Sequence, residues 1–184
     1  RRNLERISEI MAYEVSKKLK YQSKAITTTL GVADAQVLAD EVVLATILRA
    51  GLPMHQGFLN YFDRAESAFV SAYRKITSGD DYDVHVEYCA APNINGKTLI
   101  ITDPMLATGT SMVLVHHALK KHGIPKQLHL VTAIATQEAI DFVLSKLPSN
   151  TTIWVGAIDE ELTAQSYIVP GLGDAGDLAF GDKL

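Results

Sequence analysis

The chain has 184 residues, of which 47% are hydrophobic and 21% charged, and these values indicate one globular domain with a buried core. Its formal net charge is −4 and its Lys and Arg residues are scattered, so we expect neither nucleic acid nor an acidic membrane surface as a partner. No apolar run approaches the ~20 residues that a bilayer span requires, so no membrane partner is expected.

The cysteine content and the N-terminus fit a cytoplasmic protein. Cys89 is the only cysteine, so no internal disulfide can form, as is usual in a reducing compartment. The first residues carry no signal-peptide pattern. Because the chain starts at Arg1 and not at Met, we expect residues 1–184 to be a single domain that is incomplete at its N-terminus.

In the first part of the chain, an amphipathic helix is followed by a strand and a second helix. Apolar residues recur at helical spacing from Leu4 to Leu19, which predicts a helix with one buried face. Residues 41–51 have the pattern of a buried strand that ends near Arg49. Pro53 follows shortly afterwards and favours the first turn of a helix.

Three more strands are expected before the middle of the chain, at residues 67–74, 82–90 and 98–103. In the second of these, hydrophobic residues alternate, which places three of them on one half-exposed side: Val84, Val86 and Tyr88. The third is continuously apolar, as is typical of a parallel sheet that is covered on both faces.

The second half of the chain continues this alternation of helices and strands. Apolar residues from Met112 to Leu119 share one face of a helix, and Gly123 with Pro125 marks its end. A further helix starts at Thr136, which is a good N-cap residue. The strands that accompany these helices are residues 127–135 and 151–158.

The C-terminal part is expected to be irregular. Residues 159–162 are most simply a solvated acidic turn, and residues 167–184 contain too much Gly and Pro for regular structure. Strands that alternate with helices indicate an α/β domain with a mainly parallel sheet. In such sheets ligands bind beyond the carboxyl ends of the strands, which is where Arg49 and Asp103 lie.

A loop rich in small hydroxyl residues, Thr108 to Ser111, stands where the strand that ends at Asp103 gives way to a helix. The first N–H groups of a helix have no internal partner, and Gly109 lets the backbone approach a ligand closely, so the loop suits a phosphate. It lacks the Gly-Lys-Ser/Thr of a nucleoside triphosphate site. Ordinary helix capping explains the same residue types equally well.

This segment, DPMLATGTS from Asp103 to Ser111, resembles the phosphoribosyl-diphosphate loop of the uracil phosphoribosyltransferase family. Three further segments match that family in order: ILRAGL around Arg49, YRK around Arg74, and YIVPGLGDAGDLAFG from Tyr167. The resemblance implies a type I phosphoribosyltransferase-like fold, with helices flanking the sheet and a C-terminal hood over the base. It also implies Mg²⁺ as cofactor and a homodimer or larger homo-oligomer.

The implied activity is transfer of a phosphoribosyl group from 5-phosphoribosyl 1-diphosphate (PRPP) to uracil, giving UMP and diphosphate. Residues matched to catalysis are Arg49, Asp103 and Asp174. Residues matched to PRPP binding are Arg49, Arg74, Asp103, Pro104, Met105, Leu106, Ala107, Thr108, Gly109, Thr110, Ser111 and Asp174. Residues matched to uracil binding are Tyr167, Ile168, Gly173, Asp174 and Ala175.

Two positions depart from the family pattern. Thr110 replaces the usual second Gly of the loop, and Leu178 stands where the family usually has Lys or Arg. A β-branched residue tolerates positive φ badly, so we expect Thr110 to have negative φ and the helix to begin at or beside it.

The residue types agree with the implied chemistry. Arginine carries a planar, permanently charged fork that suits a diphosphate, although Arg49 alone also fits a structural ion pair and Arg74 a solvated strand end. His116 and His117 are expected at the surface, and no His or Cys cluster has metal-ligand spacing, so Mg²⁺ would arrive with PRPP.

The C-terminal glycines can expose backbone N–H and C=O groups, and a rigid frame of these reads uracil and rejects cytosine. Asp174 is the candidate acceptor of the uracil N1 proton, while Asp177 is a candidate for orienting the loop. Two other functions remain open at this stage: a nucleotide-binding regulator on the same fold that does not turn over, and a transferase for another base.

Overall fold

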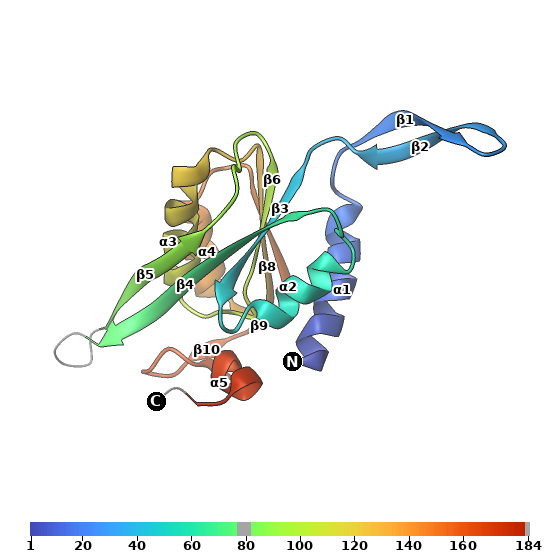
Figure 1. The fold of residues 1–184 in the computed structure, drawn as a ribbon. Helices are drawn as coiled ribbons and strands as arrows, with labels where there is room; N and C mark the ends of the chain where they lie inside the picture. Colours follow the sequence, from blue (N-terminus) through green and yellow to red (C-terminus); the bar gives the residue numbers. More distant parts are fainter. Residues whose placement is uncertain (77–81, 183–184) are drawn as a thin grey trace.

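The central feature of the protein is a mixed, mainly parallel sheet, seen in a computed structural model that describes residues 1–76 and 82–182 (Figure 1). For residues 73–76 and 82–85 it describes the backbone alone. The strands are, in spatial order, β5 (Tyr82–Ala90), β4 (Glu66–Ile76), β3 (Val42–Leu48), β6 (Thr98–Thr102), β8 (Gln127–Thr136) and β7 (Met105–Leu106), with β9 (Thr151–Asp159) also paired to β8. The pairing of β4 with β5 is antiparallel and the other pairings are parallel, which confirms the predicted fold class.

Helices cover both faces of this sheet. α1 (Arg2–Ser16) and α2 (Leu52–Leu59) lie on one face, while α3 (Thr110–Leu119) and α4 (Gln137–Lys146) lie on the other (Figure 1). A short 3₁₀ turn, Lys120–His122, follows α3 and ends at Gly123, as predicted. Thr136 caps α4 by accepting a hydrogen bond from Ala139 N at 3.1 Å, which confirms its predicted role.

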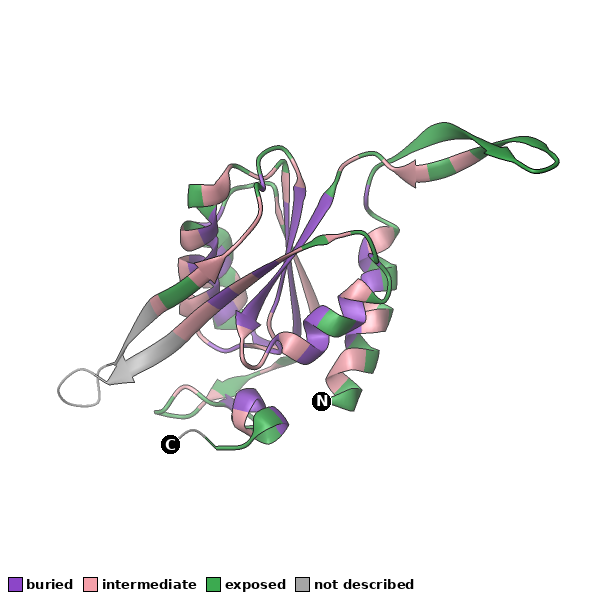
Figure 2. Ribbon diagram, in the orientation of Figure 1, coloured by how far each residue is buried: buried purple, intermediate pink, exposed green. Residues whose placement is uncertain are grey.

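The core consists of two layers, one on each face of the sheet. Along β3, Val43, Ala45 and Ile47 contribute to the layer under α3 and α4. Val42 and Leu44 contribute to the layer under α1 and α2. Successive side chains of a strand point to opposite faces, and both faces are covered here, so the central strands are mostly apolar and are buried in Figure 2.

Sequence reasoning made no prediction for a long hairpin formed by β1 (Tyr21–Thr28) and β2 (Gly31–Leu38). The hairpin projects away from the sheet (Figure 1), and every residue of β1 is exposed. At its tip, Leu30 and Val32 are 98% and 72% exposed. Because the hairpin packs so little against its own domain, no buried face marks its strands in the sequence.

The C-terminal segment is more regular than predicted. It contains β10 (Glu161–Leu162), β11 (Ile168–Val169) and the six-residue helix α5 (Ala175–Phe180). β10 and β11 pair antiparallel, and the Asp174 side chain caps α5 by accepting from Asp177 N at 2.9 Å. The expectation of irregular structure was therefore wrong, because side-chain capping and strand pairing outweigh the low propensities of Gly and Pro.

Two local predictions are also corrected. Val86 packs against the core but Tyr88 is 54% exposed, because a β-bulge at Glu87 switches the alternation of β5 so that Cys89 faces the core. The acidic turn is not simply solvated, because Asp159 Oδ2 accepts a hydrogen bond from Gly171 N at 3.0 Å.

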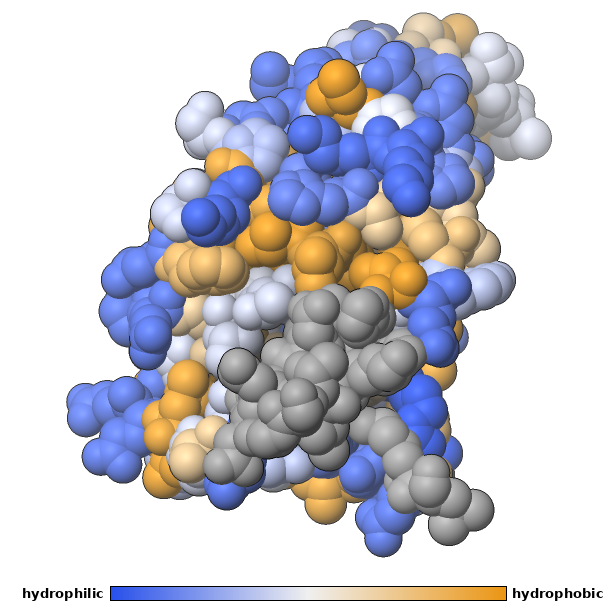
Figure 3. Space-filling model, turned by 90° about the vertical axis from the view of Figure 1, so that its left-hand side faces the viewer, coloured by the Kyte–Doolittle hydropathy of each residue, from blue (hydrophilic) through white to orange (hydrophobic). Residues whose placement is uncertain are grey.

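No helix among the described residues is both long enough and apolar enough to cross a bilayer. Seen from the side of β5 and α3, hydrophilic residues cover the upper part of the surface, and a band of hydrophobic residues crosses its middle (Figure 3).

Of the histidines whose side chains the structure describes, three are buried in the core, and one of them corrects a prediction. His116 is 2% exposed, whereas the neighbouring His117 is exposed. His129 Nδ1 accepts from Trp154 Nε1 at 3.2 Å, and His55 Nε2 lies 3.1 Å from Ser67 Oγ. Burial lowers the pKa of His55 and of His116 to about 4, and in His116 the charges of His117 and Lys120 add to the effect.

A buried neutral histidine makes stability depend on pH. The pKa of His116 is lower in the folded state than in the unfolded chain, so its contribution is present above about pH 6.5 and is lost as the pH falls toward 4. The free energy of unfolding should therefore fall between pH 7 and pH 5. We predict that this fall is about 1–2 kcal/mol smaller in His116→Gln than in the unsubstituted protein. Urea unfolding at the two pH values measures this. His117→Gln is the exposed control, and equal losses in all three proteins would contradict the prediction.

Candidate active site

A pocket of about 540 Å³ opens at the carboxyl ends of β3 and β6. Most of its lining comes from three segments that are distant in sequence: residues 47–50 at the end of β3, residues 103–109 with 111 and 112 after β6, and C-terminal residues 166, 167 and 173–176. The predicted site residues among the lining are Arg49, Asp103, Pro104, Met105, Leu106, Ala107, Thr108, Gly109, Ser111, Tyr167, Gly173, Asp174 and Ala175. The fold therefore brings three of the four separate sequence motifs together, those around Arg49, Asp103 and Asp174.

Three predicted site residues are not part of this lining. Thr110 lies in the first turn of α3 and is partly exposed. Ile168 is 2% exposed and pairs with Leu162 in the small C-terminal sheet, so its side chain is buried outside the pocket. The side chain of Arg74 lies outside the described residues, although its backbone belongs to β4.

The register of β3 and β6 brings Arg49 and Asp103 to the same edge. Thr46 pairs with Thr102, and their hydroxyls donate to Thr102 O at 3.4 Å and to Ala45 O at 3.3 Å, respectively. Gly51 fits against this pair, because a Cβ there would lie 2.8 Å from Thr102 O and overlap Thr46 Oγ1. The chain can therefore turn sharply after Arg49 while staying against β6.

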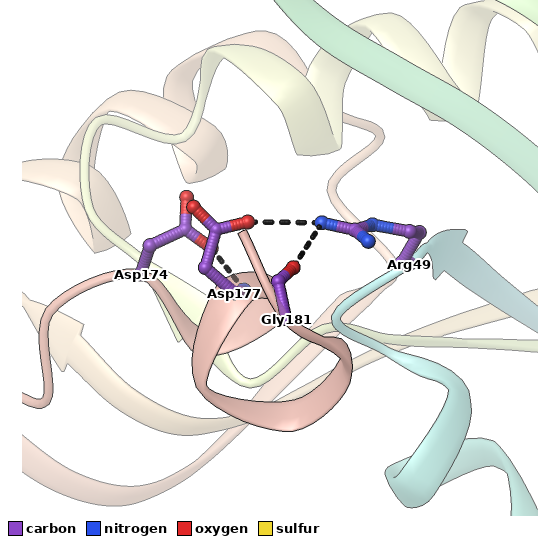
Figure 4. Close-up of polar contacts among 4 residues, drawn as sticks. All are labelled: Arg49, Asp174, Asp177 and Gly181. Carbon is purple, nitrogen blue, oxygen red and sulfur yellow. Dashed lines mark hydrogen bonds and ion pairs between the residues drawn. The ribbon is translucent and has the colours of Figure 1, made fainter. Parts of the chain in front are cut away.

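Arg49 makes polar contacts with the C-terminal segment. Its Nη2 donates to Asp177 Oδ1 at 2.9 Å and to Gly181 O at 3.2 Å (Figure 4). The two side chains are 38% and 30% exposed. The structural ion pair considered for Arg49 is thus present, and its partner is Asp177, the residue expected to orient this loop.

The loop before α3 presents backbone at the floor of the pocket. Gly109 is the N-cap of α3 with φ of 79°, and no side chain caps this helix. A Cβ at Gly109 would lie 2.6 Å from Val143 Cγ2, so close packing against α4 also requires glycine. The hydroxyls therefore do not act as the ordinary cap: Thr108 Oγ1 instead donates to Thr110 Oγ1 at 3.3 Å.

The backbone prediction for Thr110 is confirmed. Among the described residues, the one non-glycine residue with positive φ is Ser166, so Thr110 has negative φ. α3 begins at Thr110, as the β-branched side chain led us to expect.

Asp103 sits where β6 ends, and its N–H donates to Val131 O at 3.1 Å. Burial of its carboxyl group, and secondly the charge of Asp174, raise the pKa of Asp103 to about 8. Such a shift marks a desolvated site that two carboxylates share, which is common at functional sites. Asp174 has a structural task as well, since its Oδ1 accepts from Asp177 N.

Sequence reasoning missed several pocket and support residues. Ser71, Glu87 and Ser166 line the pocket, and Asp159 accepts a hydrogen bond from Gly171 N in the C-terminal segment. For Asp159 the available signal was an acidic residue directly at the end of a predicted strand, the same signal that drew attention to Asp103.

Among the side chains that the structure describes, those of residues 1–72 and 86–182, no group of three or more His, Cys, Asp or Glu is arranged to hold a metal ion.

Sequence comparisons identify the relatives of this chain. The profile of the uracil phosphoribosyltransferase family matches residues 1–182. The uracil phosphoribosyltransferase of Porphyromonas gingivalis is 59% identical over 184 residues, which are 100% of this chain and 85% of that protein. The uracil phosphoribosyltransferase of Methanothermobacter thermautotrophicus is 37% identical over 183 residues, covering 98% of this chain and 83% of that protein.

Solved structures agree on the fold. The AQ2163 protein of Aquifex aeolicus has a TM-score of 0.89 at 32% identity, covering 97% of this chain and 84% of that chain. A hypoxanthine phosphoribosyltransferase of Staphylococcus aureus has a TM-score of 0.56 at 14% identity, covering 86% and 74%, and so shows the fold alone. The profile match over nearly the whole chain, together with the close full-length relatives, shows that this chain belongs to the uracil phosphoribosyltransferase family.

Proposed function

We propose that this chain transfers the phosphoribosyl group of PRPP to uracil and so forms UMP and diphosphate. The observation that carries the proposal is the meeting of three features in one pocket: the uncapped start of α3, Arg49, and the C-terminal glycine-rich segment. A phosphate, a diphosphate and a flat polar base need these three kinds of surface.

The direct test is uracil-dependent release of diphosphate from PRPP in the presence of Mg²⁺. If the chain is an enzyme, diphosphate release requires both uracil and PRPP. A regulator on the same fold would bind UMP or PRPP with no release above the rate without protein.

Each part of the pocket has a proposed task in binding PRPP. The loop Thr108–Ser111 and the first N–H groups of α3 bind the 5-phosphate. Arg49 and Arg74 bind the diphosphate. Asp103 accepts hydrogen bonds from the ribose hydroxyls. These bonds compensate the repulsion between its carboxylate and the phosphate groups of PRPP.

In the reaction, the bond from the anomeric carbon to the diphosphate oxygen breaks, and the bond from that carbon to uracil N1 forms. The diphosphate leaves with the bonding electron pair, and cationic character develops on the ribose. Arg49 lowers the barrier by stabilising the negative charge of the leaving group. Mg²⁺, carried by the diphosphate, supplies further charge neutralisation there.

Uracil N1 must also lose its proton, and we assign its acceptance to Asp174. Its carboxylate lines the pocket and lies near enough to Asp103 to raise the pKa of that group. The backbone around Tyr167, Gly173 and Ala175 is assigned to the base edges, with Ile168 behind it. Cytosine would place an amino group against an N–H of such a frame and leave polar groups unpaired.

The protein is proposed to act as a homodimer or larger homo-oligomer in the cytoplasm. The projecting hairpin supports self-association, because Leu30 and Val32 at its tip are too exposed to stabilise the monomer. The single free thiol of Cys89 supports a reducing compartment.

We predict that Asp103→Asn lowers kcat/KM for PRPP by about tenfold to a hundredfold at pH 9, where the Asp103 carboxyl group is ionised, as expected for one charged hydrogen bond. Folding raises the pKa of Asp103 from 3.8 to about 8, so this residue's contribution to stability is lost as the pH rises through 8. Asparagine cannot ionise, so the melting temperature of Asp103→Asn should fall less between pH 6 and pH 9 than that of the unsubstituted protein. Asp63→Asn, at an exposed position, is the control. Normal kcat/KM in the Asp103 variant would remove this residue from the mechanism.

Arg49→Ala should raise the KM for PRPP by more than tenfold and lower the melting temperature by about 4 °C or less. The small stability loss is expected because an ion pair this exposed contributes at most about 1 kcal/mol. Arg64→Ala removes an exposed arginine elsewhere and controls for charge. A large fall in melting temperature with an unchanged KM would make the role of Arg49 purely structural.

Two neighbouring substitutions test the loop. Thr110→Gly should keep uracil-dependent activity, with affinity for PRPP changed by about tenfold or less, because one hydroxyl contact is lost. Gly109→Ala should abolish PRPP binding, because its φ of 79° and the 2.6 Å approach to Val143 Cγ2 exclude a Cβ. Binding titrations on both folded variants measure this, and loss of turnover in Thr110→Gly would show instead that the hydroxyl is essential.

A further inference from the structure

The two contacts of Arg49 with the C-terminal segment meet on one nitrogen. Nη2 carries two hydrogens, and it donates to Asp177 Oδ1 at 2.9 Å and to Gly181 O at 3.2 Å (Figure 4). Both of its hydrogens are therefore engaged. Asp177 comes from the first turn of α5, and Gly181 directly follows that helix.

This nitrogen is the one that Arg49 needs for paired bonds to phosphate. A guanidinium can bind an anion side-on through Nε and Nη2, or end-on through Nη1 and Nη2. Nη2 belongs to both faces. As long as α5 holds it, Arg49 has no face free for two parallel bonds to a diphosphate.

We propose that Asp177 is an affinity-determining residue that competes with the diphosphate for Nη2 of Arg49. This inference rests on the proposed function. In the empty site, the carboxylate of Asp177 compensates the charge of Arg49. When PRPP binds, its diphosphate displaces Asp177 and the Gly181 carbonyl from Nη2, and when product diphosphate leaves, they return.

The energetics favour an exchange rather than a permanent bond. The Arg49 and Asp177 side chains are 38% and 30% exposed, so water screens their attraction and makes the pair weak. A diphosphate carries several charges and offers two acceptors to one guanidinium face, so it outcompetes a single carboxylate. The contact with Asp177 still lowers the affinity for both PRPP and product diphosphate.

The exchange also links the two halves of the site. Asp174 is the N-cap residue of α5, since its side chain accepts a hydrogen bond from Asp177 N, and Ala175 is the first residue of the helix. A helix that carries these pocket residues is thus held to the end of β3 by Arg49 only while the diphosphate position is empty.

The test is the Asp177→Asn variant, which keeps the size of the side chain and the N–H that Asp174 caps. Isothermal titration with PRPP, and separately with inorganic diphosphate, in Mg²⁺ buffer should give dissociation constants about two- to five-fold lower than those of the unsubstituted protein. Asp182→Asn, an exposed carboxylate close in sequence, controls for the general loss of negative charge. In an Arg49→Ala background, the Asp177 substitution should change neither constant.

The inference is overturned if Asp177→Asn binds both ligands with unchanged or weaker affinity, or if Asp182→Asn gives the same gain. Asp177→Ala is a second variant, measured in the same way, should the Asn variant lose its melting transition. Failure of the unsubstituted protein to bind PRPP or to release diphosphate with uracil would overturn the proposed function itself. Turnover with an unchanged Asp177→Asn affinity would overturn this inference alone.

Discussion

The pairing of Thr46 with Thr102 is the constraint on which the pocket depends. Two buried hydrogen bonds between these strand ends fix the register of β3 against β6. That register brings Arg49 and Asp103 to the same pocket, although more than fifty residues separate them in sequence. A slip of one residue would send the side chains of either strand to the opposite face of the sheet. The chemistry of the site is therefore built on strand geometry.

Charge balance is the second organising feature. Arg49, Asp103 and Asp174 line the same pocket, and Asp177 contacts Arg49. Burial makes ionisation of Asp103 costly, as its raised pKa shows. A polyanionic ligand has to enter this acidic setting, so backbone N–H groups at the start of α3 and the fork of Arg49 supply the attraction. The contacts of Arg49 with α5 compensate its charge until such a ligand arrives.

The sequence supported the sheet and the loop well, because their signals are local. A continuous apolar run such as residues 98–103 predicts a doubly covered strand, and Thr136 is a cap by residue type. The β-branched Thr110 predicted its own backbone conformation. Family motifs then selected the pocket residues, since no pattern within one chain identifies the ligand of a phosphate loop.

What the sequence left open depends on contacts between distant segments. The hairpin of β1 and β2 has no buried face, so no periodicity marks it. Neither the partner of Arg49 nor the bond from Gly171 to Asp159 is visible without the fold. The sequence predicts His116 at the surface because adjacent histidines on a helix point apart, but nothing in the sequence says that one of them is buried.

The choice of base is the central claim, because hypoxanthine phosphoribosyltransferases share this fold. The most direct measurement offers the protein PRPP and Mg²⁺ with uracil, cytosine, hypoxanthine or guanine, and identifies each nucleotide product by mass. We predict UMP from uracil, with cytosine and both purines at least about a thousandfold slower, because a mismatched base leaves buried polar groups unpaired. Nucleotide formation from hypoxanthine or cytosine at a rate comparable to that from uracil would contradict the account.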